Sequence, residues 1–553
     1  MPRDDHIDKP YLPNRKDFHL GKGTVMKSLM KRVFAAAAAI ATVFGLAATT
    51  VATANAADNA TLTVSTTDAK FAGKTVNAYK MFSATVSGDG KAVSYTLTDE
   101  WKPFFKNSVG LTGVTDENVN DKANDYVSKL KDSTLVAFAT KASNWAQTKA
   151  NNITADATAT VSADASNGKY TATFTGLGYG YYVVAVPGAT LANAKSQYAT
   201  LVSVHSTKVD ADIKGDLPTV DKKVQVDGTG KVATDAKIGD TLTFTLTSTI
   251  PDMSAYDTYT FNFKDTLSKG LTFGQVKSVK VENVTLTENT DYTVTTPTAS
   301  NNNTLTVAMK DFKTKQQANA GKKITVTYTA TLNENAVVGG AGNVNSAKIQ
   351  YSNNPSTNGT GESEPSKVRV FTYGFTVDKY TGDQYTDAAT RLAGAEFTLA
   401  HKDGSAISFV QVSAGSATAN AVYRVAKAGE TGTTTITTPA NGKVVFEGLE
   451  NGEYTLTETK APAGYNKLAS AIGVKVDGQN NGTDTTNATV TITYNNDNGN
   501  DYNQTASNGV IPVQNKSGAI LPGTGGMGTI AFTVIGVLVI ALGVAWTLKR
   551  KNA

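Results

Sequence analysis

The chain has 553 residues, of which 40% are hydrophobic and 18% are charged. It is therefore long enough for about three or four domains and too apolar for a disordered polymer. It contains no cysteine, which excludes disulfides, thiolate zinc sites, iron–sulfur clusters and a cysteine nucleophile.

The beginning of the chain has the composition of an export signal. Met26–Ala56 starts with basic residues, continues with an apolar run to about Ala48 and ends in Ala-Asn-Ala. This order is typical of a secretory signal peptide. We therefore predict cleavage between Ala56 and Ala57, and we interpret the polar residues 1–25 as a misassigned start upstream of Met26.

The end of the chain shows three features in a fixed order. The sequence LPGTGG at 521–526 precedes an apolar stretch, 529–548, and a basic tail follows at once. A stretch of this length predicts a transmembrane helix, and the basic tail places the C-terminus in the cytoplasm.

Removal of both ends changes the net charge. The whole chain has a formal charge of +5, but eight basic and four acidic residues lie in 1–56 and three basic residues in 525–553. Segment 57–524 keeps 41 basic and 43 acidic residues, a formal charge of −2. No basic face is indicated, so nucleic acid is not an expected partner.

The middle of the chain has the pattern of a mainly β protein. Thr, Val, Tyr and Phe alternate with polar residues in Thr241–Ile250, Lys323–Leu332 and Lys443–Glu458. Period-two alternation is typical of half-buried strands, and short strands separated by Gly, Asn and Asp turns predict stacked β-sandwiches of the immunoglobulin-like kind.

One region departs from this alternation. Apolar residues recur at helical spacing in Thr115–Ala150, with a break near Asp132, and Thr98–Asn107 has the pattern of a further helical turn. We expect a first sandwich with a mainly helical insertion.

Composition indicates two domain boundaries. Pro218 interrupts a polar stretch, and a Gly, Asn and Pro cluster at 353–366 is typical of a linker. The expected domains are 57–215, 216–365 and 366–520, followed by the terminal signal at 521–553.

The inventory of reactive residues argues against an enzyme. Only His205 and His401 remain in segment 57–524, in different expected domains, and no zinc spacing or phosphate-binding loop is present. We expect no metal and no cofactor. A neutral buried Lys beside an Asn, whose carbonyl is polarised by a protonated Asp or Glu, could still form an amide and release ammonia.

The three-part C-terminal end resembles the sorting signal of Gram-positive surface proteins. The resemblance implies that a membrane transpeptidase, a sortase, recognises Leu521, Pro522, Gly523, Thr524 and Gly525. It would cut between the last two residues and hold the chain as a thioester.

The third expected domain contains YTLTETKAPAGY, which resembles the E-box of the collagen-adhesin B-type repeat of Gram-positive pilins. The resemblance assigns Glu458 as the catalytic carboxylate. It assigns Lys379, in FTVDKYT, and Asn515, in VQNKSGAILPGTG, as the partners of an isopeptide bond.

The second expected domain opens with PTVDKKV, contains FNFKDTLSKGLTF and ends with GNVNSAKIQYSNNP, which is similar to the collagen-adhesin A-type isopeptide domain of major pilins. The matching positions are Lys222, Asp265 and Asn345. Lys223 and Asn343 lie beside the chosen residues, and alternation in a strand places neighbours on opposite faces.

The first expected domain, with VNAYKMF and GLGYGYYVVAV, resembles the N-terminal domain of the same pilins. Such domains end in a motif around V-x-V-Y-P-K-N, and this chain lacks its Tyr-Pro. Position relative to PTVDKKV favours Lys214, in a Gly-flanked connector, as the lysine that links subunits, with Lys208 as the alternative.

The resemblance covers 26–553 and implies the structural major subunit of a cell-wall-anchored pilus, with no catalytic turnover of its own. The implied partners are a pilus-specific sortase, a housekeeping sortase, other copies of the chain, minor pilins, peptidoglycan and an unidentified host or matrix ligand. The alternative is a monomeric wall-anchored adhesin or minor tip pilin that binds host protein or glycan.

Overall fold

The computed structural model describes residues 59–164, 167–189, 199–353, 358–387, 389–478, 489–496 and 501–518, and the single positions 537, 539, 540, 542 and 546. The expected signal peptide, the cleavage point at Ala56 and Ala57, the polar start at 1–25 and the sorting motif at 521–525 lie outside these residues. Of the expected span 529–548, the five single positions are helical and exposed. Among the described residues, no helix is long and apolar enough to cross a membrane.

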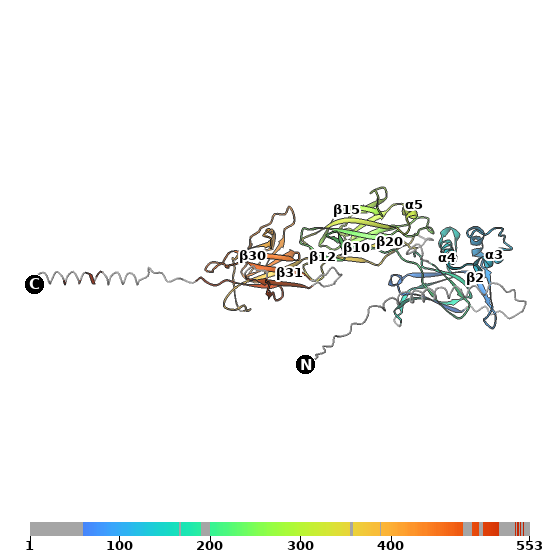
Figure 1. Cartoon of the computed structure of the whole chain (residues 1–553), viewed down its shortest axis with the longest axis horizontal. Helices are drawn as coiled ribbons and strands as arrows, with labels where there is room; N and C mark the ends of the chain where they lie inside the picture. Colours follow the sequence, from blue (N-terminus) through green and yellow to red (C-terminus); the bar gives the residue numbers. More distant parts are fainter. Residues whose placement is uncertain are drawn as a thin grey trace, which may run out of the picture.

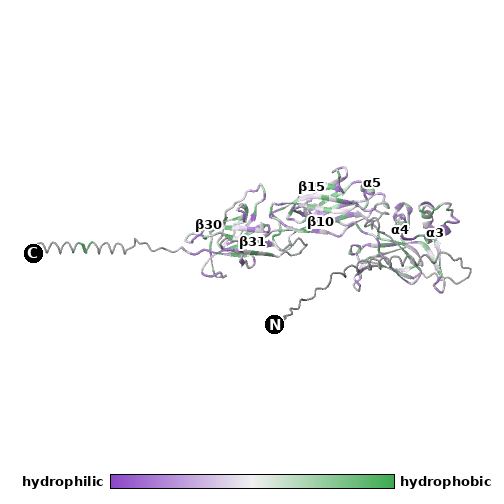
Figure 2. Cartoon of the chain, viewed as in Figure 1, coloured by the Kyte–Doolittle hydropathy of each residue, from purple (hydrophilic) through white to green (hydrophobic). Residues whose placement is uncertain are grey.

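Three β-rich units follow one another along the chain and lie roughly in a row in Figure 1, from blue through green to orange. We refer to 59–213 as the first unit, 217–371 as the second and 373–518 as the third. Each is built on two sheets. Figure 2 shows hydrophobic and hydrophilic residues interleaved along the strands, as period-two alternation requires. The expectation of a mainly β chain of tandem domains is confirmed.

The first unit has one sheet of order β5-β6-β1-β9 and one of order β3-β2-β7-β8, with β4 paired with β2. The first sheet consists of β1 (Ala60–Thr66), β5 (Ser162–Asp164), β6 (Lys169–Leu177) and β9 (Lys208–Asp212). The second consists of β2 (Thr75–Val86), β3 (Val93–Leu97), β4 (Ala157–Thr160), β7 (Gly180–Ala185) and β8 (Ala199–Val204). Strand β9 runs parallel to β1 and leads into the connector to the second unit.

Helices lie beside the second of these sheets (Figure 1). They are α2 (Lys102–Asn107), α3 (Val119–Ser128) and α4 (Asp132–Gln147), with 3₁₀ turns at Ala69–Phe71, Asp99–Trp101 and Lys149–Asn151. The helical insertion is as expected, and α4 begins at the predicted break. Phe105 of α2 is fully buried and meets Phe82 of β2 edge to face, with ring centroids 5.7 Å apart. Aromatic packing therefore joins the helices to the sheet.

The second unit has sheets of order β11-β10-β13-β19-β15-β16 and β12-β22-β20-β14-β18-β17, with β21 paired with β20. The first comprises β10 (Asp221–Val226), β11 (Thr229–Lys231), β13 (Thr241–Thr249), β15 (Leu271–Val281), β16 (Val284–Thr285) and β19 (Lys323–Leu332). The other comprises β12 (Ala233–Asp235), β14 (Phe261–Leu267), β17 (Tyr292–Thr295), β18 (Thr304–Met309), β20 (Asn343–Ser352), β21 (Thr360–Glu362) and β22 (Ser366–Phe371). Helix α5 (Phe312–Gln316) and 3₁₀ turns at Ala299–Asn301 and Gln317–Asn319 complete it.

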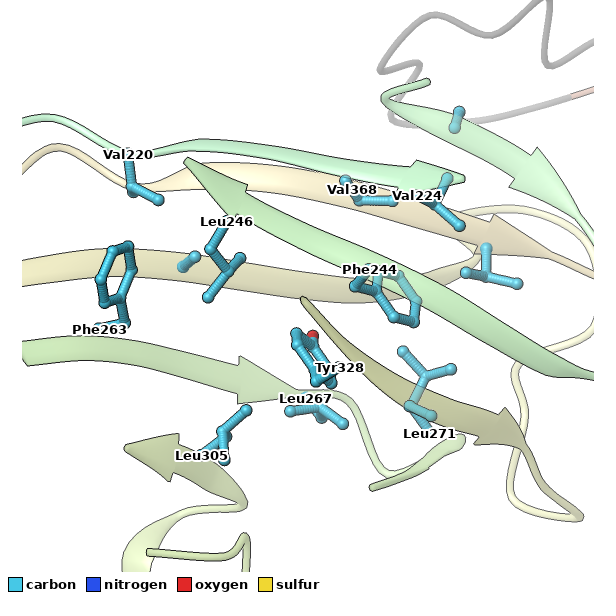
Figure 3. Close-up of a cluster of buried hydrophobic side chains, with 14 of the residues drawn as sticks. Val220, Val224, Phe244, Leu246, Phe263, Leu267, Leu271, Leu305, Tyr328 and Val368 are labelled. Carbon is cyan, nitrogen blue, oxygen red and sulfur yellow. The ribbon is translucent and has the colours of Figure 1, made fainter. Parts of the chain in front are cut away.

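The core of the second unit lies between its two sheets. Figure 3 shows Tyr328 among aliphatic and aromatic side chains there, near Phe244 and Leu267. Tyr328 is fully buried, so its hydroxyl group requires a hydrogen-bond partner inside the protein.

The second unit extends past the expected boundary at 365. Strand β22 pairs with β20 and β12 of the second unit, and β23 of the third unit begins at Tyr373, so Thr372 alone separates them. Of the Gly, Asn and Pro cluster at 353–366, the described residues 353 and 358–366 lie within the second unit, where β21 pairs with β20. Such residues mark tight turns inside a domain as readily as linkers between domains.

The third unit has sheets of order β24-β23-β29-β27-β26 and β28-β25-β30-β31-β32-β33, with β34 paired with β23. The first comprises β23 (Tyr373–Thr381), β24 (Thr390–Arg391), β26 (Phe409–Ser413), β27 (Ala421–Val425), β29 (Lys443–Leu449) and β34 (Val510–Gln514). The other comprises β25 (Glu396–His401), β28 (Ile436–Thr437), β30 (Gly452–Lys460), β31 (Ile472–Gly478), β32 (Val490–Asn495) and β33 (Gln504–Thr505). Strand β34 runs parallel to β23, so the unit's first strand lies beside its last described strand.

The contact between helices and sheet in the first unit can be tested by truncating Phe105. We expect Phe105→Ala to lower the free energy of unfolding of the first unit by about 3–5 kcal/mol, because it leaves a cavity in an aromatic core. In a fragment spanning 57–524 the tryptophans are Trp101 and Trp145, so fluorescence during urea unfolding reports this unit. The equally buried Phe312→Ala in the second unit is the control and should leave that transition unchanged.

Candidate functional site

A buried polar cluster lies between the two sheets of the second unit. Lys222 comes from β10 in one sheet, and Asp265 and Asn345 come from β14 and β20 in the other. In the pairing of β14 with β20, Asp265 faces Ala347 and Asn345 faces Leu267, so the carboxyl and amide groups are diagonal neighbours on one face. All three side chains have 0% exposure. The structure therefore brings together the three residues that the resemblance assigns in this unit.

A tyrosine hydroxyl connects these three side chains. The amine of Lys222 donates hydrogen bonds to Asp265 Oδ2 and, at 2.9 Å, to the hydroxyl oxygen of Tyr328. The Tyr328 hydroxyl donates to Asp265 Oδ2 at 2.6 Å and accepts from Asn345 Nδ2 at 2.6 Å. We refer to Lys222, Asp265, Tyr328 and Asn345 as the second-unit cluster.

Burial shifts the pKa values of Lys222 and Tyr328 in this cluster. Burial lowers the pKa of Lys222 to about 8, although the ion pair with Asp265 opposes the shift. Burial also raises the pKa of Tyr328 well above its usual value, with the nearby Asp265 as a second cause. A lysine with a pKa near neutrality supplies an appreciable fraction of the free amine, which is the nucleophilic form.

Within the described part of the chain, two oxygens of the cluster receive no hydrogen bond. Asp265 Oδ1 and Asn345 Oδ1 are buried without a partner among the described residues. Buried acceptors without donors cost free energy. Protonation of Asp265 would turn one of them into a donor, which is the form of a carboxyl group that can polarise an amide carbonyl.

The neighbouring candidates differ from the cluster in what they contact. Lys223 is only partly buried and pairs with Asp221 Oδ1 at 2.8 Å, on the other face of the strand from Lys222. Asn343 is two residues from Asn345 and therefore lies on the same face, so alternation does not separate these two. Its amide is hydrogen-bonded to the backbone of Val337 and Val370, which removes it from the cluster.

The third unit contains a cluster of related composition, which we call the third-unit cluster. Lys379 lies in β23, Asn515 follows the parallel neighbour β34, and Glu458 comes from β30 in the facing sheet. The exposed fraction is 0% for Lys379, 2% for Glu458 and 1% for Asn515. The three assigned residues again meet between two sheets.

The hydrogen bonds of the third-unit cluster differ from those of the second. The Lys379 amine is 3.2 Å from Glu458 Oε1 and 3.4 Å from the carbonyl oxygen of Val513. Asn515 Nδ2 donates to Glu458 Oε2 at 3.0 Å and to the carbonyl oxygen of Asn466 at 2.9 Å. The backbone N–H of Leu468 donates to Glu458 Oε2 at 2.8 Å. Burial lowers the pKa of Lys379 to about 8 here too.

The sequence analysis did not identify Tyr328, nor the backbone groups of Asn466 and Leu468. Tyr328 lies in the strand KITVTYTATL, where it reads as one more apolar position. A tyrosine among aliphatic residues on the inward face of a strand is the available signal, because its hydroxyl must find a buried partner. Backbone groups carry no such signal.

The two lysines considered for linkage between subunits lie outside these clusters. Lys208 is exposed at the start of β9. Lys214 lies in the connector between the first and second units, next to Gly215, whose φ is 104°. Its side chain is 27% exposed, and its amine is 3.2 Å from Asp212 Oδ2.

The two histidines of segment 57–524 are far apart in the sequence, and neither contacts a residue of the two clusters. His205 is exposed and its Nδ1 is 2.9 Å from the Ser203 hydroxyl, and His401 packs against the ring of Tyr454. Within the described residues, no group of His, Asp and Glu side chains could hold a metal ion.

Comparison with known proteins gives two domain matches. The prealbumin-like fold domain (SpaA) matches residues 383–491, and the Gram-positive pilin backbone subunit 2, Cna-B-like domain, matches residues 238–355. These matches fall in the third and second units. The description of the second match is Cna-B-like, where the sequence resemblance indicated the A type.

One curated relative and several solved structures align with the chain. The trypsin-resistant surface T6 protein of Streptococcus pyogenes serotype M6 is 26% identical over 279 residues, which are 46% of this chain and 44% of that protein. The chain thus spans less than half the length of this relative. The T6 backbone pilin of serotype M6 Streptococcus pyogenes aligns at 18% identity over 83% of this chain and 99% of that one, with a TM-score of 0.44. The full-length major pilin SpaD from Corynebacterium diphtheriae aligns at 20% identity over 83% of this chain and 98% of the SpaD chain, with a TM-score of 0.37.

The lowered pKa of Lys222 predicts a pH dependence in a chain whose Asn345 is replaced, where the amine stays free. The pKa is about 8 in the folded state and 10.5 in the reference state. Between pH 8 and pH 10.5 the Lys222 amine is protonated in the unfolded chain and neutral in the folded chain. The free energy of unfolding therefore rises with pH in this range, and below pH 8, where both states are protonated, it does not depend on this group. We expect calorimetry of Asn345→Ala to show an unfolding temperature of the second unit that rises from about pH 8 upward. The same substitution combined with Lys222→Met removes the titrating amine and should remove this slope.

Proposed function

We propose that this chain, which carries domains of Gram-positive backbone pilins, is the structural major subunit of a covalently polymerised pilus on the bacterial cell surface. The observation that carries the proposal is that two successive units each bury a lysine, a carboxyl group and an asparagine between their sheets. In this role the chain is a substrate and a building element, and it catalyses no reaction on other molecules.

Each buried cluster is suited to form one isopeptide bond. In the second unit, Lys222 Nζ would attack Asn345 Cγ, and Nδ2 would leave as ammonia. Asp265 would take a proton from the amine and, once protonated, polarise the amide. The reaction replaces a buried ammonium group, which is costly to keep away from water, with a neutral amide. The contacts at Lys222 support this assignment.

In the third unit the same chemistry would join Lys379 to Asn515 with Glu458 as the carboxyl group. The parallel pairing of Lys379 with Val513, two residues before Asn515, supports this assignment. The bond would tie the unit's first strand to its last described strand. A covalent tie at this position opposes the separation of terminal strands when the ends of a subunit are pulled.

Polymerisation would use two groups outside the clusters, the Thr524–Gly525 peptide bond and the Lys214 amine. A pilus-specific sortase would cut between Thr524 and Gly525, and the amine of Lys214 on the next subunit would attack the resulting thioester. Partial exposure in a connector supports Lys214, because a lysine buried in a sandwich cannot reach an enzyme-bound acyl group. The contact is head to tail and does not close, so its repetition gives a fibre. A housekeeping sortase would join the base of the fibre to peptidoglycan, and minor pilins and a host ligand would be further partners.

The positions of Lys214 and Thr524 in the sequence would define which part of a subunit carries tension along the fibre. Between Lys214 and Thr524 the chain passes through the second and third units, and the first unit lies outside this path. The described residues of the first unit include no buried lysine, in accord with a unit that needs no internal cross-link.

Intact mass spectrometry tests the internal bonds. We expect a recombinant fragment spanning 58–520 to weigh about 34 Da less than its sequence requires, the mass of two ammonia molecules. In Asp265→Ala and in Glu458→Ala, the deficit relative to the variant's own sequence should fall from about 34 Da to about 17 Da, because each substitution removes the carboxyl group of one cluster. Lys214→Ala is the control and should leave both losses in place. A fragment of unshifted mass would contradict the cross-links.

Electrophoresis of boiled cell-wall extracts tests the polymer. We expect the wild type to give a ladder of high molecular mass and Lys214→Ala to give a single band that is still anchored to the surface, because only the acceptor amine is lost. Lys208→Ala is the matched control and should keep the ladder. A single band from the wild type would instead support a monomeric wall-anchored adhesin.

A further inference from the structure

Tyr328 occupies the centre of the second-unit cluster. Its hydroxyl contacts the lysine amine, the carboxylate and the asparagine amide at once. It accepts two hydrogen bonds and donates one, which is the full capacity of a phenol group. The atom that would attack and the atom that would leave, Lys222 Nζ and Asn345 Nδ2, therefore donate to the same oxygen.

The ring of Tyr328 is held in one place by its neighbours. Strand β19 lies inside its sheet, between β13 and β15. The ring stacks on Phe244, its cross-strand partner, at a centroid distance of 5.3 Å and an angle of 18°. Phe273 packs against it at 6.0 Å. Figure 3 shows the ring enclosed by core side chains. A hydroxyl held this firmly can orient reacting groups without reorganisation, which is the main source of catalytic benefit from fixed dipoles.

We propose that Tyr328 is a catalytic residue of the isopeptide reaction in the second unit, where its hydroxyl aligns Lys222 with Asn345 and relays a proton to the departing ammonia. This inference rests on the cross-link of the proposed function. It adds a fourth group to a reaction otherwise attributed to a lysine, an asparagine and a carboxyl group.

The proton balance shows why a relay is needed. The reaction starts from the ion pair of a Lys222 ammonium and an Asp265 carboxylate. One proton moves from Nζ to the carboxylate, and the lone pair so freed forms the Nζ–Cγ bond. A second proton must then move from Nζ to Nδ2 before the Cγ–Nδ2 bond breaks and ammonia leaves. The Tyr328 oxygen lies within hydrogen-bond distance of both nitrogens and of Asp265. Its hydroxyl group can therefore give its own proton to Nδ2 as it accepts the proton from Nζ, and it is a neutral phenol again after the transfer.

The third-unit cluster achieves alignment by other means. There the backbone N–H of Leu468 holds the carboxyl group, and the carbonyl oxygen of Asn466 holds the leaving amide nitrogen. Among the described residues, no tyrosine hydroxyl takes part in the hydrogen bonds of Lys379, Glu458 and Asn515. The third unit therefore serves as an internal reference within the same molecule, because loss of Tyr328 should leave its bond unaffected.

The experiment follows bond formation in Tyr328→Phe, which keeps the ring and removes only the hydroxyl. The fragment spanning 58–520 is sampled at intervals after a short induction. Intact mass gives the number of ammonia molecules lost, and proteolytic peptides assign each loss to a unit. We expect the second-unit bond to form at least about ten-fold more slowly, in line with the loss of one fixed group in a catalytic site. The third-unit bond should form at the wild-type rate.

A matched control separates this role from general packing. Tyr259 is a buried tyrosine of the same unit whose hydroxyl has no hydrogen-bond partner among the described residues. Tyr259→Phe should leave both bonds at their wild-type rates. Rates are measured on the protease-resistant, folded fraction, so that incomplete folding does not count as slow chemistry.

The pH profile gives a readout that a structural role would not move. The Tyr328 hydroxyl accepts from the ammonium form of Lys222, so its removal should lower the lysine pKa further. We expect the profile of the slow reaction in Tyr328→Phe to shift to lower pH while its maximum falls. Wild-type rate in Tyr328→Phe, or equal slowing in both units, overturns the inference. Absence of any mass loss from the second unit of the wild type overturns the cross-link itself.

Discussion

A lysine ammonium facing a carboxylate in the dry space between two sheets is the feature on which the second and third units depend. Lys222 meets Asp265, and Lys379 meets Glu458, with almost no exposure to water. A buried ion pair is stabilised only if its geometry is good, and breaking one by removing a partner costs several kcal/mol. Each sandwich therefore has to place strands distant in the sequence with accuracy, and each is specified by a polar contact as well as by its apolar core.

The two clusters connect different parts of their sandwiches. In the second unit the lysine and the asparagine come from opposite sheets, so a bond between them would tie one sheet to the other. In the third unit Lys379 and Asn515 belong to parallel neighbours in one sheet, so a bond would tie two strands along their length. In both units the carboxyl group comes from the sheet that faces the lysine's own sheet. With these bonds, two sandwiches of similar plan would resist deformation in two different directions.

The joint between the second and third units is short and hydrogen-bonded. Strand β22 ends at Phe371 and β23 begins at Tyr373. Asn451 donates its backbone N–H to Asp235 at 2.7 Å, and the amine of Lys427 is 2.6 Å from Glu334. Such contacts across the joint favour transmission of force from one unit to the next. The first unit differs, since helices and aromatic side chains form a second buried cluster beside one of its sheets, and its end leads into the connector that holds Lys214.

Local patterns were enough to predict the strands, the helical insertion and its break near Asp132, because period and turn composition depend on residues close in the sequence. Alternation also separates Lys222 from Lys223. It could not separate Asn343 from Asn345, which share a face, nor show that β22 pairs with strands of the second unit. It gave no sign that the Tyr328 hydroxyl joins the cluster. These outcomes depend on hydrogen bonds between strands far apart in the chain, and only the folded arrangement of the sheets brings those partners together.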